Sequence, residues 1–226
     1  YLVWFLAPKG LRFSTVVSCG NECDLAAEDY LEYLGADEQT KTIVAYMEGV
    51  KNGRRFFEVA REVSRKKPII LWRGGLTEQG ARAAASHTGA LAGSSTVWKA
   101  MVKQTGIVDV ESVEEVVDCA LAFHYLPLPK GRRIAIIGGQ GGTGVGTADN
   151  CYNLGLTLPQ LSETTVARLR EVLPPVGTSV GNPTDTGVAS LLNPSLYAQA
   201  IEIVAADPNI DMILVISTPV QACLEH

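Results

Sequence analysis

The chain has 226 residues and a formal net charge of -5, and 46% of its residues are hydrophobic, which suffices for the core of one large or two modest domains. The charges form no basic stripe, so we expect no nucleic-acid partner. No run approaches the ~20 apolar residues of a membrane span, and the start lacks the pattern of a signal peptide, so we expect no membrane partner and a cytoplasmic protein.

Short apolar runs alternate with stretches of helical periodicity along the chain, which is typical of βαβ units that build a parallel sheet. The opening "YLVWFLAPKG" is either a strand or the remainder of a linker. The other predicted strands cover 14–18, 42–47, 68–71, 133–138, 157–158 and 212–217. The predicted helices cover 24–34, 53–65, 94–104, 113–123, 143–154, 162–173 and 194–206. Asp24 and Ser162 are candidate N-caps for two of these helices.

A segment with two prolines and a basic turn, "LPLPKGRR", precedes a new apolar strand and indicates a domain boundary. We therefore expect an α/β fold with two doubly wound parallel-sheet domains, over 1–129 and 130–223. Residues 224–226, "LEH", resemble the remnant of a vector histidine tag and are excluded from the fold. In such sheets, ligands bind at the carboxyl ends of the strands and at the N-termini of the helices that follow.

One of the three histidines lies among very small residues, in "AAASHTGALAGSS". Because this stretch follows a predicted strand, His87 should lie at the carboxyl edge of the first sheet. Thr88, Gly89 and Gly93 leave room for backbone N–H groups to close around an anion. The simpler alternative is a structural loop histidine, with glycines that only turn the chain. The length of the small, glycine-rich run favours a binding site, since a core would need larger side chains.

A second glycine-rich stretch, "GGQGGTGVGT", follows an apolar strand and opens a predicted helix. Gly139, Gly141 and Gly144 match the GxGxxG spacing of dinucleotide sites, but the acidic residue expected at the end of the next strand is absent. The GxxxxGK[ST] pattern of a P-loop does not occur in the chain. A helix that begins near Thr143 would present N–H groups at its positive end, so Gly141, Gly142 and Thr143 are candidate phosphate-binding residues.

Several ordered motifs resemble one family. The stretch "KKPIILWRGGLTEQGARAAASHTGALAGS" resembles the phosphohistidine segment of the NDP-forming acyl-CoA synthetases, which share a superfamily with succinyl-CoA synthetase. The preceding "VVSCGNECDLAAEDYLEYLGADEQTKTIVAYMEGVKNGRRFFEVAREV" is similar to the rest of that domain, and "GGQGGTGVGTADNCYNLG" with "VGNPTDTG" is similar to the next domain. The resemblance runs from about Leu11 to Cys223 and implies two flavodoxin-like CoA-ligase domains.

The resemblance implies roles for individual residues. His87 takes the position of the histidine that carries a phosphoryl group. Glu48, in "YMEGV" at the end of a strand, takes the position of the carboxylate that orients the imidazole. Such a partner fixes the tautomer of the ring and favours its charged form between transfers. Without the family, Glu48 would be read as an ordinary loop carboxylate.

The family holds its phosphohistidine between the N-termini of two helices, whose dipoles stabilise the phosphoryl group. The resemblance places one of these helices after Gly141, Gly142 and Thr143. The other begins either after "EGVKNG" or at the His87 loop.

The implied reaction converts an acyl-CoA, phosphate and ADP into a carboxylic acid, CoA and ATP. Phosphate displaces CoA, the acyl phosphate phosphorylates His87, and the phosphohistidine phosphorylates ADP. Histidine suits the middle step because it is a good nucleophile near neutral pH. ADP or ATP and Mg²⁺ would be held mainly by an ATP-grasp domain that this sequence lacks, as it lacks the CoA-binding domain. Both domains are expected partners, and the chain is a possible oligomer.

Two other functions fit the sequence. One is a ligand-sensing, non-catalytic, synthetase-like module of a protein acetyltransferase, although this chain keeps the histidine that some of those modules lose. The other is a simple dinucleotide-binding domain that uses the Gly139 turn. Binding of NAD would favour the latter, and phosphorylation confined to His87 would favour the synthetase. The remaining basic side chains Arg73, Arg82 and Lys99 are expected to be solvated or salt-bridged.

Overall fold

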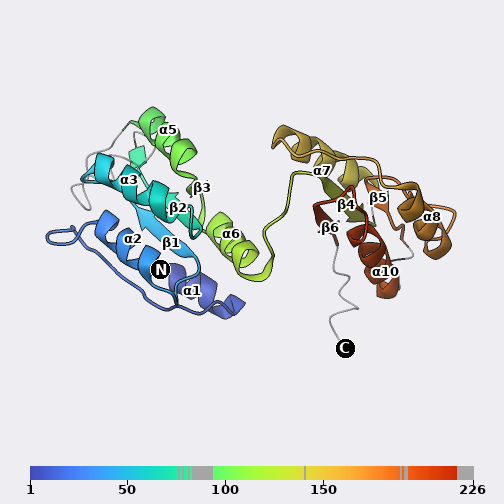
Figure 1. Ribbon diagram of the computed structural model, residues 1–226, viewed down its shortest axis with the longest axis horizontal. Coiled ribbons are helices and arrows are strands. Elements are labelled where there is room, and N and C mark those ends of the chain that lie inside the picture. Colours follow the sequence, from blue (N-terminus) through green and yellow to red (C-terminus); the bar gives the residue numbers. More distant parts are fainter. Residues whose placement is uncertain are drawn as a thin grey trace. The chain divides into compact units, whose positions relative to one another are not determined.

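The computed structural model describes residues 1–75, 77, 79–80, 82, 94–139, 141–188, 190 and 193–217. The chain divides into two compact units, Tyr1–Pro127 and a second one that begins at Leu128. Each unit has its own sheet of three parallel strands with helices on its faces (Figure 1). The predicted α/β fold class is confirmed.

The sheet of the first unit has the strand order β1-β2-β3. Its strands are β1 (Ile43–Met47), β2 (Ile69–Arg73) and β3 (Val108–Val110). In the register of β1 and β2, Ile43 pairs with Ile69 and Met47 pairs with Arg73. The central strand β2 is apolar at successive positions because both of its faces are covered by helices.

Alternate side chains of β2 pack against different helices. Ile69 and Leu71 face α2 (Ala27–Ala36), α3 (Gly53–Val63) and α5 (Ser95–Thr105). Ile70 faces α1 (Leu2–Leu6) and α6 (Val113–Tyr125) on the other side. A short turn, η1 (Ala7–Lys9), follows α1. Both faces of the sheet are therefore covered by helices, and a binding site in such a sheet is expected at the carboxyl ends of its strands.

The second unit repeats this plan with the strand order β5-β4-β6. Its strands are β4 (Ile134–Gly138), β5 (Thr184–Asp185) and β6 (Met212–Ile216). Its helices are α7 (Gly141–Asn153), α8 (Glu163–Val172) and α10 (Pro194–Ala205). Ala135 and Ile137 pack against α8 and α10, whereas Ile134 and Ile136 pack against Cys151 of α7.

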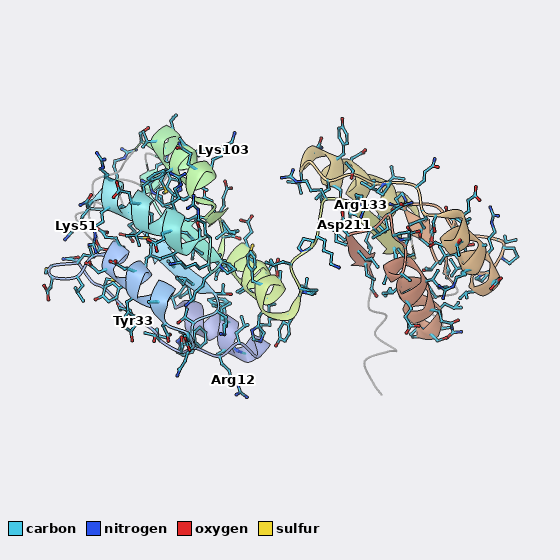
Figure 2. All side chains as sticks on the ribbon, viewed as in Figure 1. Arg12, Tyr33, Lys51, Lys103, Arg133 and Asp211 are labelled. Atoms are coloured by element: carbon cyan, nitrogen blue, oxygen red, sulfur yellow. The ribbon has the colours of Figure 1, made fainter. Side chains whose placement is uncertain are left out.

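An ion pair joins the start of β4 to the start of β6. Arg133 Nη2 lies 2.8 Å from Asp211 Oδ1, and the backbone N–H of Arg133 donates to Asp211 Oδ2 at 3.0 Å (Figure 2). Arg133 Nε also donates to Asp211 Oδ2, at 3.0 Å. Since Ile134 and Met212 are paired next to them, this contact fixes the register of the two strands.

Serine caps explain where several helices begin. The side chains of Ser94, Ser112 and Ser162 each accept a hydrogen bond from a backbone N–H in the first turn of α5, α6 and α8. The prediction of Ser162 as an N-cap is confirmed. The prediction of Asp24 is wrong, because α2 begins only at Ala27, where the N–H of Ala26 donates to Asp29 Oδ2 at 2.8 Å.

Three sequence predictions about strands need correction. Residues 14–18 form no strand, and Val16 is 64% exposed, because no neighbouring strand offers this apolar run a partner. The strand predicted at 157–158 is reduced to one bridge between Thr157 and Arg133. The opening of the chain is the helix α1 and not a strand, since Leu6 buries itself against α6.

The sequence prediction also missed β3 and β5, which have three and two residues and carry too little periodic signal. Among the residues that the structure describes, no helix is long and apolar enough to cross a membrane.

Candidate functional site

The segment with the predicted phosphoryl carrier lies outside the described residues, and this applies to His87, Thr88 and Gly89. The structure does describe the chain on either side of it. The segment leaves β2 after Arg73 and continues into α5 at Ser95. The backbone N–H of Gly74 still follows the sheet, since it donates to the carbonyl oxygen of Met47 at 2.9 Å. The segment therefore starts at the carboxyl edge of the first sheet.

Glu48 lies at the same edge, directly after the last residue of β1. The Tyr46 hydroxyl donates to Glu48 Oε1 at 3.1 Å. The Tyr46 ring packs edge-on against Trp72, with 5.0 Å between the ring centroids. Partial burial, followed by the hydrogen bond to Glu48 and its charge, raises the pKa of Tyr46, so the phenol stays neutral and remains a donor. Glu48 is thus a held carboxylate that can accept a hydrogen bond from an imidazole N–H.

Gly74 is required beside this pair. A Cβ built on Gly74 would lie 2.5 Å from the Tyr46 hydroxyl oxygen. A larger residue at position 74 would require the half-exposed Tyr46 side chain to shift. Gly74, the first residue after β2, therefore lies beside the Tyr46 hydroxyl that donates to Glu48.

A lysine organises the loop before α2 at the carboxyl edge of the first sheet. Lys51 Nζ donates to the carbonyl oxygens of Asn21 and Glu22 at 2.7 and 2.6 Å. Glu22 has a positive φ of 53°, which is uncommon for a residue other than glycine. The lysine side chain thus satisfies both carbonyl groups of this turn.

The helix α3 begins at Gly53, the last residue of "EGVKNG". The Asn52 side chain accepts a hydrogen bond from the N–H of Arg55 at 3.1 Å, and this N-cap satisfies one N–H of the first turn. The family resemblance implied that one of two helix N-termini near the phosphohistidine lies either here or at the His87 loop. The structure contains a helix at the first of these places, and its role in phosphate binding stays a prediction.

Arg73 is not solvated, although the sequence suggested this, and among the described residues it forms no ion pair. Arg73 is only 7% exposed, and its guanidinium lies over the ring of Trp98, with 4.4 Å from Cζ to the ring centroid. Burial lowers the pKa of the guanidinium, and the charge of Asp109 opposes this shift. The burial of Arg73 could have been predicted from the sequence, because side chains alternate between the two faces of a strand. Residue 73 therefore lies on the same face as Ile69 and Leu71.

In the second unit, the glycine-rich turn leads directly into a helix. The helix α7 begins at Gly141, two residues earlier than expected, so Gly141, Gly142 and Thr143 together form its first turn. All three residues are exposed. The first N–H groups of an α-helix have no partner within the helix and lie at the positive end of its dipole. The structure therefore brings these three predicted residues together in an arrangement that suits an oxyanion.

Buried hydroxyl groups support the strand end that precedes this turn. Thr186 Oγ1 donates to the carbonyl oxygen of Gly138 at 3.1 Å and lies 2.8 Å from Ser190 Oγ. The Tyr197 hydroxyl donates to the carbonyl oxygen of Ile216 at 3.1 Å. A Cβ built on Gly139 would lie 2.8 Å from that hydroxyl oxygen. Close packing alone therefore accounts for the glycine at position 139.

The sequence indicates that "VGNPTDTG" is a turn with an N-cap at Asp185 and at most a contribution to a phosphate or substrate site, and the structure places this aspartate beside the first turn of α7. Asp185 ends β5, and its Oδ1 accepts a hydrogen bond from the N–H of Gly187 at 2.8 Å. A Cβ built on Gly141 would lie 3.1 Å from Asp185 Oδ2. The carboxylate thus lies at the positive end of a helix, where a negative charge is stabilised.

Among the described residues, no group of three or more His, Cys, Asp or Glu side chains could hold a metal ion.

Two protein families match the chain. The one described as a succinyl-CoA ligase like flavodoxin domain matches residues 2–123, and the one described as a Ligase-CoA domain matches residues 134–220. The alpha subunit of ADP-forming acetate–CoA ligase II from Pyrococcus furiosus is 43% identical over 215 residues, which are 95% of this chain and 46% of that protein. ADP-forming acetate–CoA ligase I from Archaeoglobus fulgidus is 41% identical over 212 residues, which are 93% of this chain and 30% of that protein.

A solved structure is similar along almost the whole chain. It is described as the dinucleotide forming acetyl-coenzyme A synthetase 1 of Ca. Korarchaeum cryptofilum in complex with phosphate and ADP. It has a TM-score of 0.86 and 34% sequence identity, and the match covers 96% of this chain and 47% of that one. The chain thus spans less than half the length of each of these three proteins.

Proposed function

Because the chain belongs to the superfamily of NDP-forming acyl-CoA synthetases, which includes succinyl-CoA synthetase, we propose that it is the phosphoryl-carrying part of such an enzyme. The complete enzyme would convert an acyl-CoA, phosphate and ADP into a carboxylic acid, CoA and ATP. The observation that carries this proposal is the held carboxylate of Glu48, which lies at the sheet edge where the segment with His87 begins.

His87 carries the phosphoryl group between two partners. Phosphate displaces CoA from the acyl-CoA and forms an acyl phosphate and the free thiol. A nitrogen of His87 attacks the phosphorus of the acyl phosphate, and the bond from phosphorus to the acyl oxygen breaks, so that the carboxylate leaves. The phosphoryl group then passes from His87 to the terminal oxygen of ADP, which forms ATP and restores the imidazole. Mg²⁺ bound with the nucleotide would neutralise its phosphate charge.

Glu48 orients the imidazole in this proposal. Its carboxylate accepts a hydrogen bond from the ring nitrogen that does not carry the phosphoryl group, which fixes the tautomer and stabilises positive charge on the ring. The Tyr46 hydroxyl supports this role, because it holds one oxygen of the carboxylate at 3.1 Å.

The first turn of α7 binds phosphoryl oxygens in the second unit. Gly141, Gly142 and Thr143 would supply backbone N–H groups and the positive end of the helix dipole. Support for this comes from the position of the turn after the buried strand β4 and from the exposure of all three residues. Thr88 and Gly89 would contribute further N–H groups next to His87.

The acyl group is proposed only as a class, a carboxylic acid that forms a thioester with CoA. Similar proteins are named as ligases of acetate and of 4-hydroxybutyrate. We propose that an ATP-grasp domain and a CoA-binding domain complete the enzyme, on the same chain or on separate subunits. They would supply the contacts to the nucleotide and to CoA.

A labelling experiment tests this function. The chain is mixed with a matching ATP-grasp domain, Mg²⁺ and γ-labelled ATP, and acid-labile, alkali-stable label on the chain is measured. We expect His87→Ala to abolish the label and Glu48→Gln to slow it. His124→Ala is the matched control, because it removes an exposed histidine from α6. This variant should take up label at the same rate as the wild type.

The outcomes separate the alternatives. Label that persists in His87→Ala, or its absence from the wild type with a folded and bound partner, would contradict the proposal. NAD binding by the unlabelled wild type would then favour a dinucleotide-binding domain.

A further inference from the structure

A buried arginine ends β2 at a position where the strand pattern calls for an apolar side chain. Arg73 lies on the same face of the strand as Ile69 and Leu71, which α3 and α5 cover. Arg73 is 7% exposed. Arginine is almost never buried to this extent unless its charge is matched, so the neighbours of the guanidinium need an explanation.

An aromatic ring faces the guanidinium. Cζ of Arg73 lies 4.4 Å from the centroid of the Trp98 ring, within the range of a cation–π contact. Trp98 also stacks on Phe56, with 6.4 Å between the centroids and 28° between the planes. The indole N–H of Trp98 donates to Asp109 Oδ1 at 3.2 Å. The ring against which Arg73 packs is therefore fixed by two further neighbours.

One nitrogen of Arg73 lacks a hydrogen bond. Among the described residues, Nε is buried and has no partner, which is unfavourable for a charged group. A methionine would fill a similar space without this cost. The presence of arginine at this position indicates a use for the cation beyond the filling of space.

The place of the two residues along the chain shows what their contact joins. Arg73 is the last residue of β2, and Trp98 lies in the first turns of α5, so the contact connects the two ends of the segment 74–94, which contains His87. We propose that the stack of Arg73 on Trp98 ties these two ends together and thereby positions His87 for phosphoryl transfer. Arg73 acts as a positioning residue, and this inference rests on the proposed function.

The first test measures trypsin cleavage after Arg82, the one lysine or arginine within 74–94. Cleavage of a folded chain requires local opening, which a tie between the ends of the segment opposes. We expect Arg73→Met to be cleaved after Arg82 roughly tenfold faster than the wild type. Arg54→Met is the matched control, because it removes a highly exposed arginine from α3, and it should be cleaved like the wild type.

The second test measures the rate at which His87 takes label from ATP in the presence of the ATP-grasp partner. Arg73→Met should slow labelling at saturating ATP roughly tenfold and leave the half-saturating ATP concentration unchanged, since the nucleotide binds elsewhere. Arg73→Lys should recover part of the rate, because an ammonium group also stacks on an indole. A residue that only filled space would be replaced by methionine without loss and would show no such recovery.

The outcomes keep the two proposals apart. Equal cleavage after Arg82 in Arg73→Met and Arg54→Met would overturn the tie between the segment ends, whatever the labelling rates. Faster cleavage with unchanged labelling would overturn the positioning of His87. Absence of label from the wild type would refute the proposed function and the positioning role, while the cleavage rates would still decide whether the tie exists. If Arg73→Met does not fold, Arg73→Gln, which removes the charge and keeps a polar side chain, takes its place, and its cleavage at the control rate would overturn the tie.

Discussion

Replacement of Gly139 by alanine should destabilise the second unit. The added Cβ would lie 2.8 Å from the Tyr197 hydroxyl oxygen and 3.3 Å from Ser190 Oγ. Neither group can withdraw freely, because Tyr197 donates to Ile216 and the buried Ser190 hydroxyl donates to the carbonyl oxygen of Gly187 at 2.7 Å. Overpacking of this kind costs roughly 1–3 kcal/mol. We expect the free energy of unfolding of the second unit to fall by about 2 kcal/mol.

The two units can be followed separately during unfolding. The three tryptophans, Trp4, Trp72 and Trp98, all belong to the first unit, so their fluorescence reports on that unit. Far-UV circular dichroism reports on the helices of both units. In urea, Gly139→Ala should shift only the dichroism transition of the second unit, by about 1 M for a slope of about 2 kcal/mol per M. The tryptophan transition should stay in place.

Two further variants test the physical reason. Gly142→Ala is the control for stability, since among the described residues nothing lies within 4 Å of a Cβ at this position. The double variant Gly139→Ala/Tyr197→Phe removes the hydroxyl that the new Cβ meets, so its loss of stability should be smaller than the sum of the two single losses. An unchanged dichroism midpoint in Gly139→Ala, or losses that simply add, would refute the close approach as the reason for glycine.

Other perturbations should act at single contacts. Tyr46→Phe removes the donor to Glu48 and should slow labelling of His87 about tenfold, equivalent to ~1.4 kcal/mol, whereas equal rates would show that the carboxylate is held by other contacts. Hydrogen bonds from Arg133 lower the pKa of Asp211 to about 2, below the ~3.9 of an unfolded chain, so the stability from this pair is present above about pH 4 and is lost as the pH falls toward 2. Acid titration of the dichroism signal should show this loss in the wild type and a smaller one in Asp211→Asn. Asn182→Ala should destabilise the second unit by about 3 kcal/mol in urea, because the amide serves three backbone groups, and an unchanged midpoint would mean that water replaces it.

Long apolar runs predicted the sheets well, and short or marginal ones did not. Strands β1, β2, β4 and β6 lie within about a residue or two of their predicted ranges, because each contains an apolar run of four or more residues. The run at 14–18 has only two apolar residues, Val16 and Val17, and forms no strand. Whether an apolar run becomes a strand depends on a neighbour to pair with, and this information lies elsewhere in the chain.

The candidate site was predictable where function follows from position at a strand end. Glu48 lies directly after β1, as expected, and Gly141 to Thr143 open the helix after β4. The supporting contacts were not predictable, since Tyr46 lies two residues before Glu48 and its donation depends on the local side-chain conformation. The contact between Arg73 and Trp98 also depends on packing between β2 and α5, which no local pattern records.

The glycine spacing of the second unit shows how packing can imitate a binding motif. Gly139, Gly141 and Gly144 have the GxGxxG spacing, yet each has a neighbour that a side chain would meet. A Cβ would lie 2.8 Å from the Tyr197 hydroxyl oxygen at the first position, 3.1 Å from Asp185 Oδ2 at the second and 3.4 Å from Pro183 at the third. The first two contacts are closer than normal and favour glycine without any dinucleotide, whereas the third is an ordinary van der Waals contact. A tight strand–helix turn with a close-packed helix therefore suffices to produce the spacing, and the chemistry of the bound ligand has to be inferred from the neighbouring side chains.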